Sequence, residues 1–402
     1  MTIVSPPGIS SIDTFSINKS VLIPFTEILV DFVNDISKSI LKDKDFKEHP
    51  EILALAFWMR KSHIQKLKVH FSQLQGEKIF LGRGVIFHLA PSNVDTIFVY
   101  SWLISLLVGN SNIVRLSAKK NLQTELLLDT INSILAQKKY SILCERVLIL
   151  QYGHEDEITK KLSLMADTRV IWGGDQTIEH IRMLPIKATA TELTFADKFS
   201  FALIKSDELL KEQNLQRLIR NFYNDAFSFS QMACSSIRLI AWVGTEKDNH
   251  KAKKIFWKAL GSYTLQKAPT EITPADIVNK LVAECSIAIE SPIKIEKNSN
   301  PYINKINISR LTEVKEDLHC GTGLFYELET NDLISIFQDI NKKHQTVSHY
   351  GFNPEELKQA IYKTLPSGID RIVPIGKSLE FSHIWDGTDL LQSFCREVDL
   401  WN

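Results

Sequence analysis

From Gly84 onward, short runs of β-branched and apolar residues alternate with stretches of helical periodicity. The expected strands are Val85 to Ala90, Asn112 to Leu116, Arg146 to Gln151, Arg169 to Gly173 and Phe199 to Ile204. The helices expected between them cover about 94–107, 121–138, 156–165 and 177–184. This alternation predicts an α/β fold with a doubly wound, Rossmann-like parallel sheet, which binds ligands at the carboxyl ends of its strands.

Length and charge narrow the class of protein. A chain of 402 residues is long enough for two or three domains, and its 47 basic residues balance its 47 acidic ones. Nucleic acid is therefore not an expected partner, because no excess of positive charge faces a phosphate backbone. The first residues show no signal peptide, and the most apolar run, Thr96 to Gly109, is too short to span a bilayer. We expect a cytoplasmic protein without stable membrane insertion.

The chain divides into two expected domains. Residues 1–204, largely helical up to about residue 80, form a nucleotide-binding domain together with the Gly- and Pro-rich tail 368–402. Residues 205–367 form a second α/β lobe, which begins with a polar helix and the stretch FSFSQMACSSIRLIAW.

Cys234 stands at the start of a buried-strand pattern in that stretch. Its neighbours Ala233 and Ser235 are small, which leaves room for a carbonyl group to approach a nucleophilic thiolate. The five cysteines of the chain are scattered without CxxC spacing, which argues against a disulfide framework and a zinc site, so no metal site is expected. The default for each of them is a small buried hydrophobic residue. Cys320, beside His319, is the rival nucleophile, although adjacent strand residues point to opposite faces.

Polar residues follow three of the expected strands. Asn93 in LAPSNV carries an amide that can donate to an oxyanion, or else caps the following helix. Arg115 and Ser117 in RLSAKK can meet a ribose or phosphate, or belong to a solvated helix start.

A further strand end and one carboxylate complete the candidates. Gly173, Gly174 and Asp175 in WGGD allow a close approach of pyrophosphate to a helix N-terminus, or form a simple capped turn. No GxGxxG motif accompanies them. Glu192 in TELTF, placed just before a strand, is a candidate general base or a surface charge.

In this order, these segments resemble the aldehyde dehydrogenase superfamily, most closely its fatty acyl-CoA reductase branch from bacterial bioluminescence operons. The resemblance covers about Gly84 to Val398, and it rests on VIFHLAPSNV, GNSNIVRLSA, VIWGGDQTIEHIR, DAFSFSQMACSSIRLIAWVG, HQTVSHYG and GIDRIVPIGKSLEFSHIWDG. It implies an aldehyde dehydrogenase-like fold, with an NAD(P)-binding domain and a catalytic domain that carries the cysteine.

The resemblance also implies a reaction and its site. Cys234 would accept an acyl group from acyl-CoA or an acyl-protein donor, Asn93 would supply the oxyanion-hole amide, and Glu192 would be the glutamate near the cysteine. NADPH would then reduce the acyl-cysteine to an aldehyde. An acyl-protein synthetase partner and a homo-oligomer are implied as well.

For the cofactor, the resemblance implies that Arg115 and Ser117 contact the adenosine ribose. Gly173, Gly174 and Asp175 would stand at the pyrophosphate, where Asp175 replaces the usual serine. Two alternatives remain open at this stage: a CoA-independent aldehyde or semialdehyde dehydrogenase, and a carrier that transfers an acyl group without reducing it.

Overall fold

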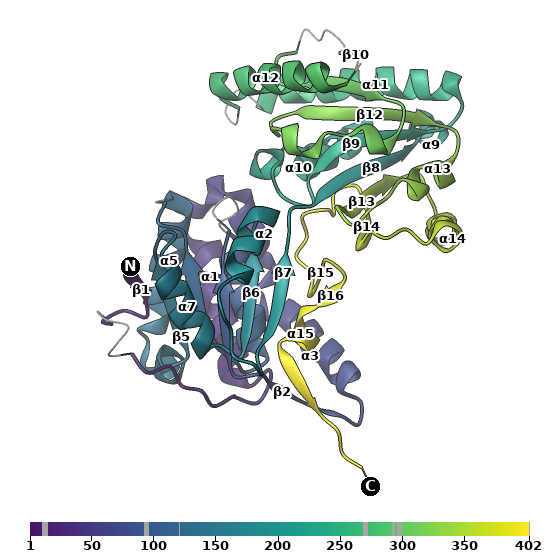
Figure 1. The fold of residues 1–402 in the computed structure, drawn as a ribbon. Helices are drawn as coiled ribbons and strands as arrows, with labels where there is room; N and C mark the ends of the chain where they lie inside the picture. The colour runs from purple at the N-terminus through teal and green to yellow at the C-terminus, as the bar shows by residue number, and fades with distance from the viewer. Residues whose placement is uncertain are drawn as a thin grey trace. The chain divides into compact units, whose positions relative to one another are not determined.

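The computed structural model describes residues 1–9, 15–91, 96–119, 121–267, 272–291, 294–295 and 300–401. The chain forms two compact units (Figure 1). Unit 1 consists of Met1–Asp197 and Phe381–Asn402, and unit 2 consists of Lys198–Glu380. No helix among the described residues is long and apolar enough to cross a membrane.

Unit 1 is built on a six-stranded sheet with the order β1-β5-β4-β3-β6-β7. All neighbours in this sheet are parallel except β1, which pairs antiparallel to β5. Because the strand order reverses direction between β3 and β6, the sheet is doubly wound and has a switch point there. Its strands are β1 Thr2–Ser5, β3 Val85–Leu89, β4 Ser111–Leu116, β5 Val147–Gln151, β6 Thr168–Trp172 and β7 Thr191–Phe195.

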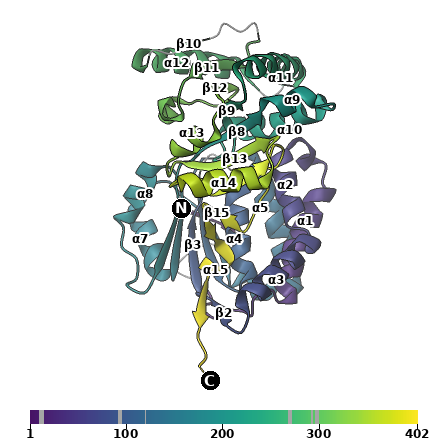
Figure 2. The ribbon, with the colours of Figure 1, turned by 90° about the vertical axis from the view of Figure 1, so that its right-hand side faces the viewer.

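Helices cover both faces of this sheet because alternate strand residues are apolar on both sides. Phe87 and Ile113 pack with α7 and α8, whereas Val114 and Ile149 pack with α1 to α5. Figure 2 shows α7 and α8 on one side and α1 and α3 on the other. The helices are α1 Glu27–Lys42, α2 Pro50–Trp58, α3 Lys61–Gln75, α4 Thr96–Leu107, α5 Leu122–Leu135, α6 Ser141–Cys144, α7 Asp156–Met165 and α8 Asp175–Arg182.

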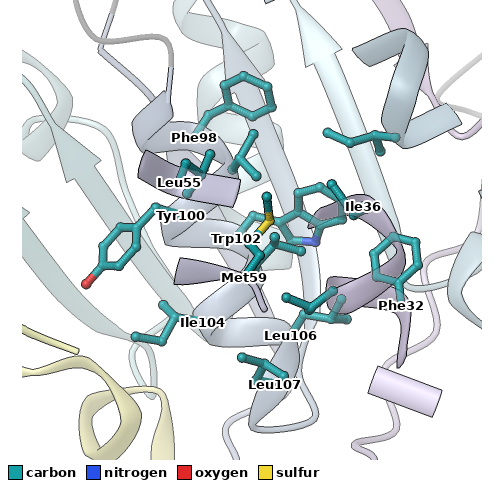
Figure 3. Packing of buried hydrophobic residues seen from close by; sticks show 14 of the residues in the cluster. Phe32, Ile36, Leu55, Met59, Phe98, Tyr100, Trp102, Ile104, Leu106 and Leu107 are labelled. Carbon is teal, nitrogen blue, oxygen red and sulfur yellow. The ribbon is translucent and has the colours of Figure 1, made fainter. Parts of the chain in front are cut away.

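The apolar run from Thr96 forms α4, in which every residue is buried. Figure 3 shows Trp102 and its neighbours on α4 among Phe32 and Ile36 of α1, Leu55 of α2 and Met59, which directly follows α2. The prediction of a buried helix is thereby confirmed. The C-terminal segment packs onto the same core, with β15 Ile384–Trp385, β16 Thr388–Asp389, α15 Leu390–Ser393, and β17 Cys395–Val398 paired to β2 Ile79–Gly82.

Unit 2 is built on a seven-stranded sheet with the order β10-β11-β12-β9-β8-β13-β14, parallel except at β10. Its strands are β8 Phe199–Lys205, β9 Ile237–Val243, β10 Lys294–Ile295, β11 Asn304–Ile308, β12 Leu324–Thr330, β13 His344–Tyr350 and β14 Arg371–Pro374. One face packs against α9 Ser206–Lys211, α10 Leu215–Phe227 and α11 Glu246–Lys267. The other packs against α12 Pro274–Glu290, α13 Leu333–Gln338 and α14 Pro354–Thr364.

One expected strand and the segment before it differ from the prediction. The segment 199–204 forms β8, but it pairs with β9 and β13 in the second sheet instead of extending the first. The first sheet ends with TELTF, which is strand β7 itself and not the residues before a strand. The division between units consequently falls at Asp197/Lys198 and Glu380/Phe381, compared with the boundaries at 204/205 and 367/368 expected from the sequence.

Candidate functional site

Cys234 lies on a strained loop between α10 and β9. Three consecutive non-glycine residues in this loop, Phe229, Ser230 and Gln231, have left-handed backbones with φ of 55°, 53° and 63°. Each costs roughly 1–2 kcal/mol relative to a right-handed residue. Such strain persists only where the surrounding structure holds the backbone in place.

The buried side chain of Gln231 provides part of that hold. Its amide nitrogen donates to the carbonyl oxygens of Ile237, at 2.8 Å, and of Leu324, at 3.1 Å. Its amide oxygen accepts from the backbone N–H of Gly323 at 2.8 Å. The side chain therefore joins the cysteine loop to the first residues of both β9 and β12.

The loop before β12 also contacts the backbone of the cysteine loop. Thr322 donates its N–H to the carbonyl of Ser230 at 3.0 Å. A Cβ at Gly321, whose φ is +74°, would lie 2.3 Å from that carbonyl oxygen. A side chain at this position would therefore displace the cysteine loop.

Cys234 itself is half-buried and precedes the amino end of β9. Its carbonyl oxygen accepts a hydrogen bond from the hydroxyl of Ser200 at 2.6 Å. The hydroxyl oxygen of Ser200 in turn accepts from the N–H of Thr346 at 3.1 Å. The backbone of the cysteine is thus tied to β8 and β13, while its side chain keeps partial access to solvent.

The rival pair His319 and Cys320 is not arranged for catalysis. His319 is buried, its Nε2 donates to the carbonyl of Leu324, and its Nδ1 accepts from the N–H of Gly321. Burial, reinforced by Arg238, lowers the pKa of His319 to about 3. Burial also raises the pKa of the Cys320 thiol. The imidazole therefore has no lone pair left to take a proton from Cys320.

The other thiols are less suitable than Cys234. Burial raises the pKa of Cys395 to about 12 and also raises that of Cys144. Cys285 is exposed on α12. Cys234 is half-buried like Cys144 and Cys320, and the hydrogen bonds described above hold its backbone and its loop.

In unit 1, the candidate cofactor residues gather at the carboxyl edge of the sheet. Arg115 is near the end of β4, Ser117 follows that strand, and Gly173 and Gly174 follow β6. Asp175 is the first residue of α8. The structure thus brings these positions to the edge where doubly wound sheets bind nucleotides. Asn93 lies outside the described residues.

Arg115 and Ser117 differ in their availability. The Arg115 guanidinium donates to the carbonyl of Gly153 at 2.5 Å and lies 5.4 Å from the ring centre of Tyr152. Ser117 accepts from the N–H of Lys119 at 3.3 Å, so its hydroxyl keeps its proton for a further partner. Lys119 is exposed. Arg115 therefore orders the neighbouring loop, and the outward-facing groups are Ser117 and Lys119.

The space beside the two glycines tests whether a dinucleotide fits here. A Cβ at Gly174 would lie 2.6 Å from the carboxylate of Asp197, and one at Gly173 would lie 3.3 Å from Thr177. Groups of the chain itself fill this space, and the carboxylates of Asp175 and Asp197 are unfavourable to a pyrophosphate. The start of α8 thus does not fit the phosphates, whereas Ser117 and Lys119 after β4 offer a hydroxyl and an exposed ammonium group.

Glu192 is the second residue of β7 and lies toward the amino end of that strand. It pairs in the sheet with Arg169, whose guanidinium binds it at 2.5 and 2.7 Å, and its other oxygen accepts from Arg182 at 3.0 Å. Both carboxylate oxygens are therefore engaged, and Glu192 belongs to unit 1 whereas Cys234 belongs to unit 2. Beyond the carboxyl end of β7, the first acidic residue in the sequence is Asp197.

Sequence reasoning missed Gln231 and Ser200 as residues that hold the cysteine backbone. Gln231 precedes Cys234 by three positions in a stretch of small and apolar residues, which was a usable signal. Ser200 had none, because its contact with Cys234 depends on the pairing of β8 with β9.

Comparison with solved structures gives the aldehyde dehydrogenase fold. A mutant of proline utilization A from Bradyrhizobium japonicum shares 11% identity with a TM-score of 0.64, over 92% of this chain and 42% of that one. Aldehyde dehydrogenase 21 from Physcomitrella patens shares 10%, with a TM-score of 0.64, over 88% and 78%. An NAD-dependent benzaldehyde dehydrogenase from Corynebacterium glutamicum shares 8%, with a TM-score of 0.60, over 92% and 84%.

The sequence comparisons agree with this fold and are more specific. Comparison with curated proteins gave no significant match. The family model described as acyl-CoA reductase (LuxC) matches residues 29–285, which is more than half of the chain and includes Cys234. This protein therefore belongs to the acyl-CoA reductase (LuxC) family.

Proposed function

We propose that this protein is an NADPH-dependent acyl-CoA reductase, which converts a fatty acyl thioester to the aldehyde through an acyl group carried on Cys234. The observation that carries the proposal is the loop of Cys234, strained over three residues and tied to β8, β9 and β12. Cys144 and Cys320 are equally half-buried, but burial raises the pKa of both of those thiols. A fixed nucleophile lowers the entropy cost of reaching the transition state.

In the first half-reaction, the Cys234 thiolate attacks the thioester carbonyl and forms a carbon–sulfur bond. The carbon–sulfur bond to CoA then breaks, and CoA leaves as its thiol after taking up a proton. The exchange is nearly isoenergetic because one thioester replaces another. The backbone hold on Cys234 keeps the attacking sulfur at one position through both steps.

In the second half-reaction, the acyl carbon is reduced by two electrons. Bound NADPH would supply a hydride to that carbon. The sulfur of Cys234 then leaves the carbon, which releases the aldehyde and restores the thiolate. The negative oxygen that forms in both half-reactions needs N–H donors, for which we propose the side-chain amide of Asn93 and the backbone N–H of Cys234.

Ser117 and Lys119 are the groups that we propose for the adenosine end of the cofactor. The hydroxyl can donate to a ribose oxygen, and the exposed ammonium favours a 2′-phosphate and thus NADPH over NADH. Gly173, Gly174 and Asp175, which the resemblance places at the pyrophosphate, are not proposed as phosphate contacts, because the carboxylates of Asp175 and Asp197 disfavour a phosphate there.

The test follows NADPH oxidation at 340 nm with purified protein and acyl-CoA thioesters of increasing chain length. We expect Cys234→Ala to abolish oxidation while circular dichroism stays unchanged. Cys320→Ala and Cys285→Ala are the matched controls and should keep the wild-type rate. The assignment would be rejected if Cys234→Ala kept full activity, or if Cys320→Ala were the one variant that lost activity.

Intact mass separates the alternatives. With acyl-CoA and no NADPH, the wild type should gain one acyl group, and Cys234→Ala should gain none. An acylated protein that never oxidises NADPH would identify a carrier. Aldehyde oxidation without CoA would identify a CoA-independent aldehyde dehydrogenase.

We also propose that the enzyme is cytoplasmic, that it receives acyl groups from CoA or from an acyl-protein synthetase, and that it forms a homo-oligomer.

A further inference from the structure

Three side chains of types that can ligate a metal meet in unit 1, one from α3 and two from the C-terminal segment far from it in sequence. His70 lies on α3, His383 precedes β15, and Asp389 ends β16 and caps α15. One donor atom from each lies within 4.8 Å of the others. The two imidazole ring centres are 4.3 Å apart.

Among the described residues, these donor atoms make no hydrogen bond. The Nε2 atoms of His70 and His383 are buried and have no hydrogen-bond partner within the described part of the chain. Both face one oxygen of Asp389, at 3.7 Å and 4.0 Å, which is too far for a hydrogen bond. Leaving a buried polar atom without a hydrogen-bond partner costs about 1–3 kcal/mol. A ligand bound between these two nitrogen atoms and the carboxylate would remove that cost.

The carboxylate is held so that one oxygen stays available. Its Oδ1 accepts the backbone N–H groups of Leu391, at 2.9 Å, and Gln392, at 3.2 Å, at the start of α15. The second oxygen, Oδ2, is the one that faces the two imidazoles. The helix cap therefore fixes the orientation of the carboxylate, as an outer hydrogen bond does for a metal ligand.

We propose that His70, His383 and Asp389 form a zinc site that fastens the C-terminal segment of unit 1 to α3. Two imidazole nitrogens and one carboxylate oxygen are ligands that Zn²⁺ accepts, with bonds of about 2.0–2.2 Å. Tetrahedral bonds of that length separate the donors by about 3.3 Å, so small side-chain rotations suffice from the present separations. A tetrahedral ion with these three ligands keeps a fourth position for water.

The sequence hides this site because its ligands come from opposite ends of the chain. His70 and His383 share no short spacing, and zinc motifs are recognised by such spacings. The hairpin of β15 and β16 brings His383 and Asp389 together.

The test measures metal binding and does not require activity. The full chain carrying Cys234→Ala, so that the reactive thiol does not compete, is stripped with a chelator and titrated with Zn²⁺ or Co²⁺. We expect one ion per chain and a Co²⁺ spectrum without thiolate charge-transfer bands. His70→Ala should weaken binding about 100-fold or more. Asp389→Asn, which keeps an oxygen for the α15 cap, should weaken it as well.

His180→Ala is the matched control, because His180 and Asp156 form another His–Asp pair, hydrogen-bonded at 2.8 Å and exposed. That variant should bind zinc as the parent protein does. Thiolate bands, binding that survives both His70→Ala and Asp389→Asn, or no zinc retained at micromolar free metal would each overturn the proposal. Circular dichroism of each variant separates loss of the site from loss of the fold.

Discussion

Replacement of Glu192 by Gln distinguishes a structural from a catalytic carboxylate. Glu192 is 17% exposed and neutralises Arg169, which is 2% exposed. Removing one partner of a buried ion pair costs about 3–5 kcal/mol, because the other charge stays buried. Arg169 keeps two further acceptors, the carbonyl of Leu184 and the hydroxyl of Ser163. We therefore expect Glu192→Gln to lower the free energy of unfolding by about 2–3 kcal/mol.

The assay is urea denaturation monitored by intrinsic tryptophan fluorescence, to which Trp172 on β6 of the same sheet contributes. Arg182→Gln is the matched control. Its partner is again Glu192, but Arg182 is 57% exposed, so the loss should stay below about 1 kcal/mol.

Kinetics then completes the distinction. At a temperature where both proteins are folded, Glu192→Gln should keep kcat within a few fold of the wild type. A general base would instead contribute about 100-fold or more. Unchanged stability together with a 100-fold lower kcat would refute the structural assignment and restore Glu192 to the reaction.

Three further changes test the site. Gln231→Leu removes three buried hydrogen bonds, so it should lower the free energy of unfolding by about 3 kcal/mol and expose the Gly323 amide to hydrogen exchange. The control Gln359→Leu changes an exposed residue and should lower it by less than about 0.5 kcal/mol. A small loss of stability in Gln231→Leu would mean that other contacts hold the loop. Asn93→Ala should lower kcat about 100-fold, and an unchanged rate would remove Asn93 from the site. His319, with its pKa lowered to about 3, stabilises the fold above pH 6.5 and loses that contribution on acidification. The advantage of the wild type over His319→Gln in unfolding free energy should thus be about 3 kcal/mol smaller at pH 4 than at pH 7; an equal advantage would contradict the lowered pKa.

The core of unit 1 followed from the sequence because its strands and helices carry strong local patterns. Asp156–Met165 forms a helix with the expected bounds, and Val85 to Leu89 is buried throughout. The transition between sheets was not visible, because β7 and β8 are separated by three residues and both are rich in β-branched and aromatic residues. Only pairing with β6 or with β9 decides which sheet each strand joins.

The cofactor positions followed from the sequence only as places on an edge, since strand ends indicate where a ligand binds but not what fills the space. Nothing local shows that Asp197 comes to lie against Gly174. The pairing of Glu192 with Arg169 likewise depends on the register of two strands that are distant in sequence. Contacts between elements therefore decide the roles that motifs leave open.

The same argument explains why one thiol among five is the candidate nucleophile. The thiolate is the reactive form, and burial disfavours it at Cys144, Cys320 and Cys395. Exposure alone does not select Cys285, because a helix surface offers an acyl group no fixed approach. The loop of Cys234 differs because its backbone is strained. Such strain is typical of sites whose function requires one fixed position of a reactive group, here the sulfur of Cys234. Acyl transfer to sulfur and its later release are reactions that require such a position.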